Sequence, residues 1–264
     1  MTQIIGVICE NGKKAIALCD RMLTTTDLSL AFEHETPKIE GLTSNCVALT
    51  AGSALIHEPI FREVKKRFRE QPKPSITRIV DSLVEEYQKL RLKRLEQAVF
   101  RRYGLTIQEF YNIQGRLHDG VVMRLTEEMR KYTLDLHILV VGVDSEGAHL
   151  YHIHNPGIAE PFNALGFCCI GTGQRHADTT FAYRRYSPSL PLKKALLIAY
   201  EAKKKAEMAG GVGKMTDIVI LDENGWHFLS EDSKDMLEKV YNSIEERTTY
   251  LKEVEAELEK LRLE

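Results

Sequence analysis

Two apolar runs around a tight turn open the sequence and constrain its fold more than any other feature. Residues 3–9 and 15–19 are apolar, and Glu10-Asn11-Gly12-Lys13 separates them. Asn-Gly between two such runs is a strong hairpin signal, because both residues tolerate positive φ. Similar turns occur at residues 144–147 and 223–225, each between apolar runs. Repeated hairpins predict sheets that are largely antiparallel.

Helices are predicted in pairs between these groups of strands. Their expected ranges are 60–69, 76–102, 175–185 and 192–208, with further helical fragments at 106–113 and 125–131 separated by His118-Asp119-Gly120. Strand pairs are expected at 37–39 with 46–50, at 134–143 with 149–154, and at 217–221 with 226–229, and a short strand at 166–170. This order predicts an α+β fold, a four-layer αββα sandwich with helices on the outer faces. We expect one domain over residues 1–230, with a helical insertion at about 91–133.

The last segment, residues 231–264, is predicted to be a long charged helix. Apolar residues recur in it at heptad spacing, with Arg247 interrupting the second position: Leu237, Ile244, Leu251 and Leu258, then Val240, Val254 and Leu261. Such a narrow apolar stripe is typical of a coiled-coil seam. We favour a seam with another chain over a helix that lies on its own domain.

Composition and charge exclude several classes of protein. The chain has 264 residues, 43% hydrophobic and 28% charged, with a formal net charge of −2. This near neutrality gives no reason to expect nucleic acid or an anionic membrane as the main partner. No apolar run approaches the roughly 18–20 residues that span a bilayer, and the N-terminal segment lacks the order of a signal peptide. We therefore expect a cytoplasmic protein. Its five scattered cysteines, without a CxxC pair, suit reduced buried thiols.

Five segments, taken in order, resemble one known family. They are TQIIGVICENGKKAIALCDRM, PKIEGLTSNCVALTAGSA, LDLHILVVGVDSEGAHLYHIHNPG, GFCCIGTGQRHA and TDIVILDENGWHFLS. Their order and spacing resemble those of proteasome β-subunits, which are N-terminal nucleophile hydrolases. The resemblance implies a threonine nucleophile, Thr2, exposed by removal of Met1, with Asp20, Lys38 and Gly52 beside it. It also implies peptide or unfolded protein substrates, a homo-oligomer, and no cofactor; an ATP-dependent unfoldase partner is left open.

The chemistry of such a site can be argued from the residue types. A threonine hydroxyl is a poor nucleophile and needs a base, and an N-terminal threonine carries one in its own α-amine, whose usual pKa is about 7.7–8.0. The positive charge of Lys38 would favour loss of the hydroxyl proton. Asp20 would hold Lys38 charged and oriented, and the Gly52 N–H would stabilise an oxyanion.

Three positions depart from the family pattern. Gln174 stands where the family has a serine after the Gly-x-Gly strand end. Near the glycine-rich loop, Glu207 and Gly210 stand for an aspartate and a second serine. Glu207 can still accept a hydrogen bond near the terminal amine, whereas Gly210 cannot replace a hydroxyl. The alternative function is therefore an inactive proteasome-like scaffold. The insertion at 91–133 either caps the cleft or forms a subunit contact.

His152 and His154 lie two residues apart on a predicted strand, so they point to the same face. Two such imidazoles can ligate zinc. The sequence spacing reveals no third ligand, and we expect no metal site.

Overall fold

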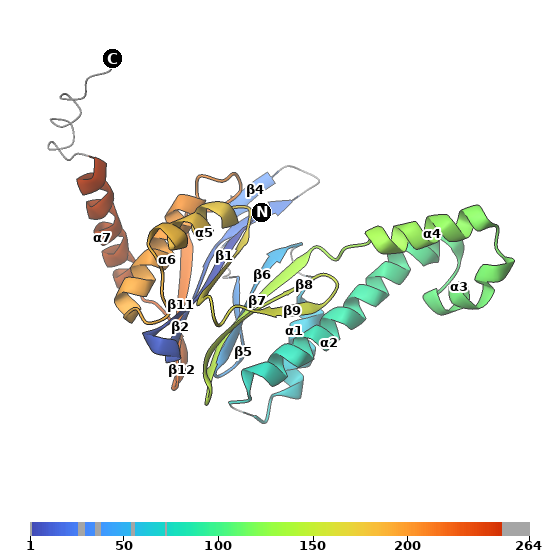
Figure 1. The fold of residues 1–264 in the computed structure, drawn as a ribbon, viewed down its shortest axis with the longest axis horizontal. Helices are drawn as coiled ribbons and strands as arrows, with labels where there is room; N and C mark the ends of the chain where they lie inside the picture. The colour runs from blue at the N-terminus through green and yellow to red at the C-terminus, as the bar shows by residue number, and fades with distance from the viewer. Residues whose placement is uncertain (1, 26–29, 35–37, 54–55, 72, 250–264) are drawn as a thin grey trace, which may run out of the picture.

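Two five-stranded antiparallel sheets form the centre of the protein. A computed structural model describes residues 2–25, 30–34, 38–53, 56–71 and 73–249 (Figure 1). The first sheet has the order β10-β1-β2-β11-β12 and the second β5-β6-β7-β8-β9. The strands are β1 (Gln3–Cys9), β2 (Lys14–Asp20), β5 (Ile39–Thr43), β6 (Cys46–Gly52), β7 (Leu136–Asp144), β8 (Gly147–His154), β9 (Ile158–Pro161), β10 (Phe167–Gly171), β11 (Thr216–Asp222) and β12 (Gly225–Phe228). The α+β class with antiparallel sheets is thus confirmed.

The first strand shows why its sequence is an unbroken apolar run. Ile4 and Ile8 of β1 belong to a core that they share with Leu139 and Val141 of the other sheet. The alternate residues Ile5 and Val7 belong to a second core, formed with helices on the opposite face. Because successive side chains of a strand point to opposite faces, a strand buried on both sides needs apolar residues throughout.

Helices pack against both sheets. The helices α1 (Glu58–Arg67) and α2 (Ile76–Leu95) share a core with the second sheet. The helices α5 (Gln174–Tyr183) and α6 (Leu192–Ala206) share one with the first sheet. This arrangement is consistent with a sandwich. In the described part of the chain, no helix is long and apolar enough to cross a membrane, and all five cysteines are free and buried.

The insertion at residues 91–133, called the arm below, projects from the second sheet and away from the first (Figure 1). The predicted helix 76–102 ends earlier: α2 stops at Leu95, and a π turn (Glu96–Phe100) and a 3-10 turn (Arg101–Tyr103) follow. Next come α3 (Ile107–Ile113) and α4 (Asp119–Lys131). The segment at 118–120, expected to separate helices, instead starts α4, because the His118 ring accepts a hydrogen bond from the Gly120 N–H.

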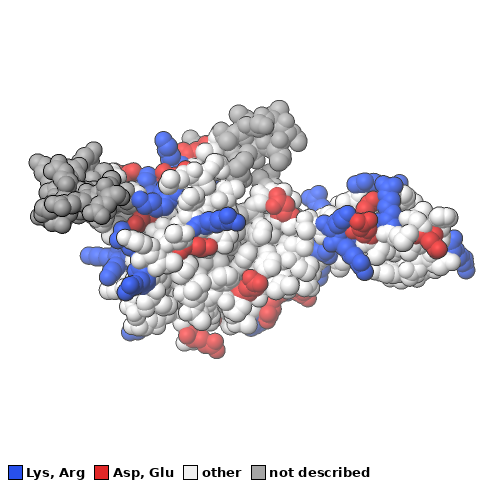
Figure 2. Space-filling model, turned by 45° about the horizontal axis from the view of Figure 1, so that its top comes forward, with Lys and Arg blue, Asp and Glu red and all other residues white. Residues whose placement is uncertain are grey.

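The arm has a small core of its own, formed by Leu95, Val99, Phe100, Phe110 and Leu125. Figure 2 shows lysine and arginine side chains on the arm, with aspartate and glutamate side chains among them.

Three short strands of the structure were not predicted from the sequence. A hairpin of β3 (Met22–Thr25) and β4 (Leu30–Glu33) follows β2, and β9 forms an edge of the second sheet. The strand expected at 37–39 is β5, which begins at Ile39 and pairs with β6. The predicted turn at Glu10–Lys13 is confirmed between β1 and β2, and Glu10, Asn11 and Gly12 in it all have positive φ.

The C-terminal helix α7 (Glu231–Thr249) begins on its own domain. Leu237 is buried in the core around α6, and Tyr241 packs against the same core. Val240 is exposed. The first turns of α7 therefore pack on their own domain, which is the alternative to the coiled-coil seam favoured from the sequence. The later seam residues Leu251, Val254, Leu258 and Leu261 lie outside the described residues.

Candidate active site

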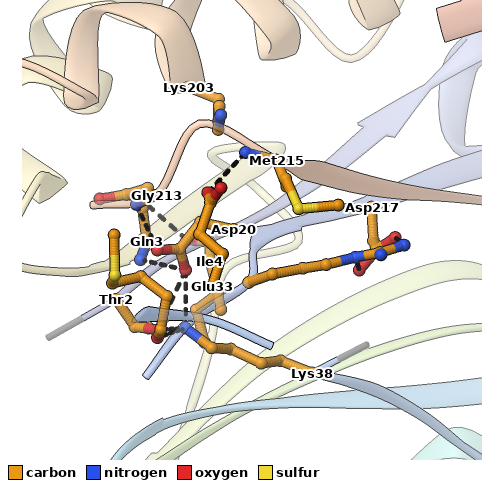
Figure 3. Close-up of polar contacts among 12 residues, drawn as sticks. Thr2, Gln3, Ile4, Asp20, Glu33, Lys38, Lys203, Gly213, Met215 and Asp217 are labelled. Atoms are coloured by element: carbon orange, nitrogen blue, oxygen red, sulfur yellow. Dashed lines mark hydrogen bonds and ion pairs between the residues drawn. The ribbon is translucent and has the colours of Figure 1, made fainter. Parts of the chain in front are cut away.

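A buried carboxylate at the end of β2 organises the site (Figure 3). The side chain of Asp20 is fully buried. Its Oδ1 accepts hydrogen bonds from the Thr2 hydroxyl at 3.0 Å, the Gln3 N–H at 3.1 Å and the Lys38 ammonium at 2.8 Å. Its Oδ2 accepts one from the Gly213 N–H at 2.8 Å. A buried charge is stable only when it is paired and hydrogen-bonded, and Asp20 meets both conditions.

Lys38, which directly precedes β5, provides the positive charge. Its Nζ donates to the Thr2 hydroxyl, to Asp20 and to the Met22 carbonyl. The Lys38 side chain is 11% exposed. These three acceptors match the three donors of an ammonium, so they fix the head group against the Thr2 hydroxyl.

Thr2 lies at the start of β1, 5% exposed, with its hydroxyl between Asp20 and Lys38. Its carbonyl accepts a hydrogen bond from the Thr172 N–H at 3.0 Å. Gly171 has a φ of +121°, and a Cβ there would overlap the Thr2 carbonyl. Only glycine allows this approach, so the end of β10 fixes the backbone of Thr2.

Gly52 lies on the other sheet, where β6 ends, and it is exposed. Its φ is +106°, and a Cβ would lie 2.5 Å from the Asp135 carbonyl oxygen. The next residue, Ser53, donates its N–H to that same carbonyl at 2.9 Å. This turn therefore requires glycine. The structure brings Thr2, Asp20 and Lys38 into direct contact and places Gly52 at an accessible strand end.

Glu207 is the residue that the sequence predicts near the terminal amine, and its charged partners in the structure are two lysines. It ends α6, where its carboxylate pairs with Lys203 and, at 3.4 Å, with Lys204. Lys203 is fully buried, and burial lowers its pKa. Lys203 also donates to the Lys214 carbonyl at 2.6 Å. Because Lys214 adjoins Gly213, Glu207 supports the loop that contacts Asp20.

Two further residues of the site were not singled out from the sequence. Arg21 follows Asp20 and binds Asp217 through two hydrogen bonds, of 2.8 and 2.5 Å. The hydrogen bonds from Arg21 to Asp217 raise the pKa of Arg21. Asp217 is buried and lies on β11, which pairs with β2. The ion pair therefore links the end of β2 to β11. Arg21 and Asp217 are far apart in the sequence, so only the strand register could have predicted this pair.

The two departures from the serine pattern are solvent-exposed. Gln174 is the first residue of α5, and Gly210 follows α6. Burial raises the pKa of Asp178, which lies one turn along α5, and a hydrogen bond from Gln174 opposes that rise. Gln174 thus forms a hydrogen bond with Asp178. Gly210 has no side-chain hydroxyl.

Comparison with known proteins supports a distant relationship to proteasome β-subunits. The sequence matches no family model. It is 30% identical over 143 residues to proteasome subunit beta 1 of Korarchaeum cryptofilum (strain OPF8). The match includes 52% of this chain and 65% of that protein, so this chain spans less than two thirds of its relative's length.

Proposed function

We propose that the chain is a threonine-type N-terminal nucleophile hydrolase that cleaves peptide bonds after removal of Met1. The observation that carries the proposal is the contact of the Thr2 hydroxyl with both Lys38 and the buried Asp20. The distant proteasome relationship and the two packed sheets support it. Under this proposal residues 1–230 form one four-layer αββα domain of the N-terminal nucleophile type.

The geometry suits a two-step acyl transfer. The Thr2 Oγ1 would attack the peptide carbonyl carbon while its proton passes to the freed α-amine, which acts as the base. Lys38 lowers the cost of the developing negative charge on Oγ1, and the Gly52 N–H would donate to the carbonyl oxygen as it becomes an oxyanion. The α-ammonium returns the proton to the leaving amine, and an ester on Thr2 remains.

The second step decides the type of product. Water attacking the ester restores Thr2 and gives hydrolysis, whereas an amine attacking it gives transpeptidation. The proposed substrates are peptides or unfolded proteins, presented to a homo-oligomer to which the arm and α7 contribute contacts. Asp20 would act through Lys38, and Glu207 through the loop at Gly213.

An inactive proteasome-like scaffold is the second candidate, favoured by Gln174 and Gly210 at positions where the family has serines. A threonine-directed electrophile, such as a β-lactone or epoxyketone, distinguishes the two functions. We expect covalent labelling at Thr2 in the wild type, none in Thr2→Ala, and retained labelling in Thr2→Ser. Absence of labelling in the wild type would support the scaffold, and labelling that persists in Thr2→Ala would place the nucleophile elsewhere.

A further inference from the structure

Three histidines and a glutamate lie together on the second sheet. His137 is on β7, His152 and His154 are on β8, and Glu160 is on β9. His152 pairs across the strands with both Leu139 and Glu160. Leu139 belongs to the core between the sheets. Because paired residues share a face, His152 also faces the interior of the sandwich.

The separations between the donor atoms fit a metal ion. His137 Nδ1 lies 3.0 Å from His152 Nε2, and His154 Nε2 lies 3.5 Å from Glu160 Oε1. Donor atoms of His152, His154 and Glu160 all lie within 4.8 Å of one another. Four ligands about 2.0–2.1 Å from a tetrahedral zinc ion are about 3.3 Å apart. Small rotations of His152, His154 and Glu160 would therefore bring their donor atoms onto one ion, and His137 lies beside His152 as a further ligand.

The backbone orients one of these rings for ligation. His154 Nδ1 lies 3.0 Å from the Asn155 carbonyl oxygen. A carbonyl only accepts, so Nδ1 is the protonated nitrogen of His154, and Nε2 faces Glu160. A hydrogen bond from the distal ring nitrogen to a carbonyl is the usual support of a metal-bound histidine. In the neutral ring, the Nε2 lone pair points toward a carboxylate, an arrangement that a cation between them stabilises.

We propose that His137, His152, His154 and Glu160 form a binding site for a divalent transition-metal ion, zinc. Three imidazoles and one carboxylate are a donor set that zinc prefers and that magnesium and calcium do not. His137 adjoins the end of β6, since it pairs with Ala51, the residue before Gly52. The zinc site would thus lie at the same end of the sheet as the proposed oxyanion donor. It does not depend on the proposed hydrolase activity.

Calorimetric titration of the metal-free full-length protein with zinc chloride tests the proposal. We expect one zinc ion per chain, no comparable binding of magnesium, and at least tenfold weaker zinc binding in both His152→Ala and His154→Ala. His227→Ala is the matched control, because His227 is an exposed histidine on the other sheet. It should leave the affinity unchanged.

Two further measurements keep the test decisive. Far-ultraviolet circular dichroism shows whether each variant is folded. If His152→Ala fails to fold, Glu160→Gln replaces it, since Glu160 is exposed and the change keeps its shape; it too should weaken zinc binding. Cobalt(II) absorption should report imidazole ligation in the wild type and change in His154→Ala. The proposal is overturned if the wild type binds no zinc, or if its affinity survives all the cluster substitutions, because the histidines then form only a stacked and hydrogen-bonded group.

Discussion

The ion pair between Lys38 and Asp20 can be tested by stability alone, without a substrate. Asp20 is fully buried and the Lys38 side chain is 11% exposed, with 2.8 Å between Nζ and Oδ1. Removing one partner of a buried pair leaves the other charge uncompensated and typically costs about 3–5 kcal/mol. Asp20→Asn and Lys38→Met remove one charge each with little change of shape. Each should therefore lower the free energy of unfolding by about 3–5 kcal/mol.

The double variant distinguishes a coupled pair from two unrelated defects. Once one charge is gone, removing the second relieves an uncompensated charge. The double variant should then lose less than the sum of the single losses, by about 1–3 kcal/mol, as for contacting residues in general. Urea unfolding followed by circular dichroism measures all four proteins.

A matched control uses an exposed pair. Lys65 binds Glu40 at 2.6 Å, with the side chains 40% and 39% exposed. Exposed pairs contribute about 0–1 kcal/mol, so Lys65→Met should cost less than about 1 kcal/mol. The reasoning fails if Asp20→Asn and Lys38→Met cost no more than this control, or if their effects simply add.

Three other changes probe separate parts of the structure. Gly52→Ala should lower the free energy of unfolding, measured in urea, by about 1–3 kcal/mol, because residues other than glycine rarely adopt this backbone conformation and the new Cβ would lie 2.5 Å from the Asp135 carbonyl oxygen. Labelling of Thr2 should slow as well. Wild-type behaviour in both assays would contradict this prediction. Phe110→Ala should remove about 3–5 kcal/mol from the arm core, raising amide hydrogen exchange within residues 91–133 but not in the sheets; a global loss of protection would show that the arm is not a separate unit. Burial raises the pKa of Asp178, so the stability that this group contributes at low pH is lost as the pH rises through its folded pKa. Asp178→Asn cannot ionise and should therefore gain stability relative to the wild type as the pH of the urea experiment is raised from about 3.5 to 7; a difference independent of pH would refute this.

Much of the fold could be predicted because its signals are local. The predicted strand at 3–9 has the same bounds as β1. A strand that is buried on both faces is apolar along its whole length, so its sequence can be recognised without its neighbours. The hairpin of β3 and β4 was missed because its strands are only four residues long and lack a continuous apolar pattern. The end of the long helix at Leu95 was missed because Glu96–Phe100 continues with helix-forming residues but adopts a π turn.

The candidate site also contains residues that the sequence predicts and contacts that only the fold creates. Thr2, Asp20 and Lys38 could be named from the resemblance of their segments to proteasome β-subunits, and the structure brings them together. The contact from Gly213 to Asp20 spans 193 residues of sequence, and no local pattern indicates it. The histidine cluster depends on strand register, which places His137 and Glu160 beside His152. Sequence spacing showed only the pair at 152 and 154.

The intact mass of the purified protein, measured before and after reaction with a threonine-directed electrophile, tests the central claim most directly. The proposed mechanism requires the free α-amine of Thr2. We therefore predict a chain lighter by one methionine residue, which then gains the mass of one electrophile on Thr2. A protein that keeps Met1 quantitatively and remains unlabelled would contradict the claim.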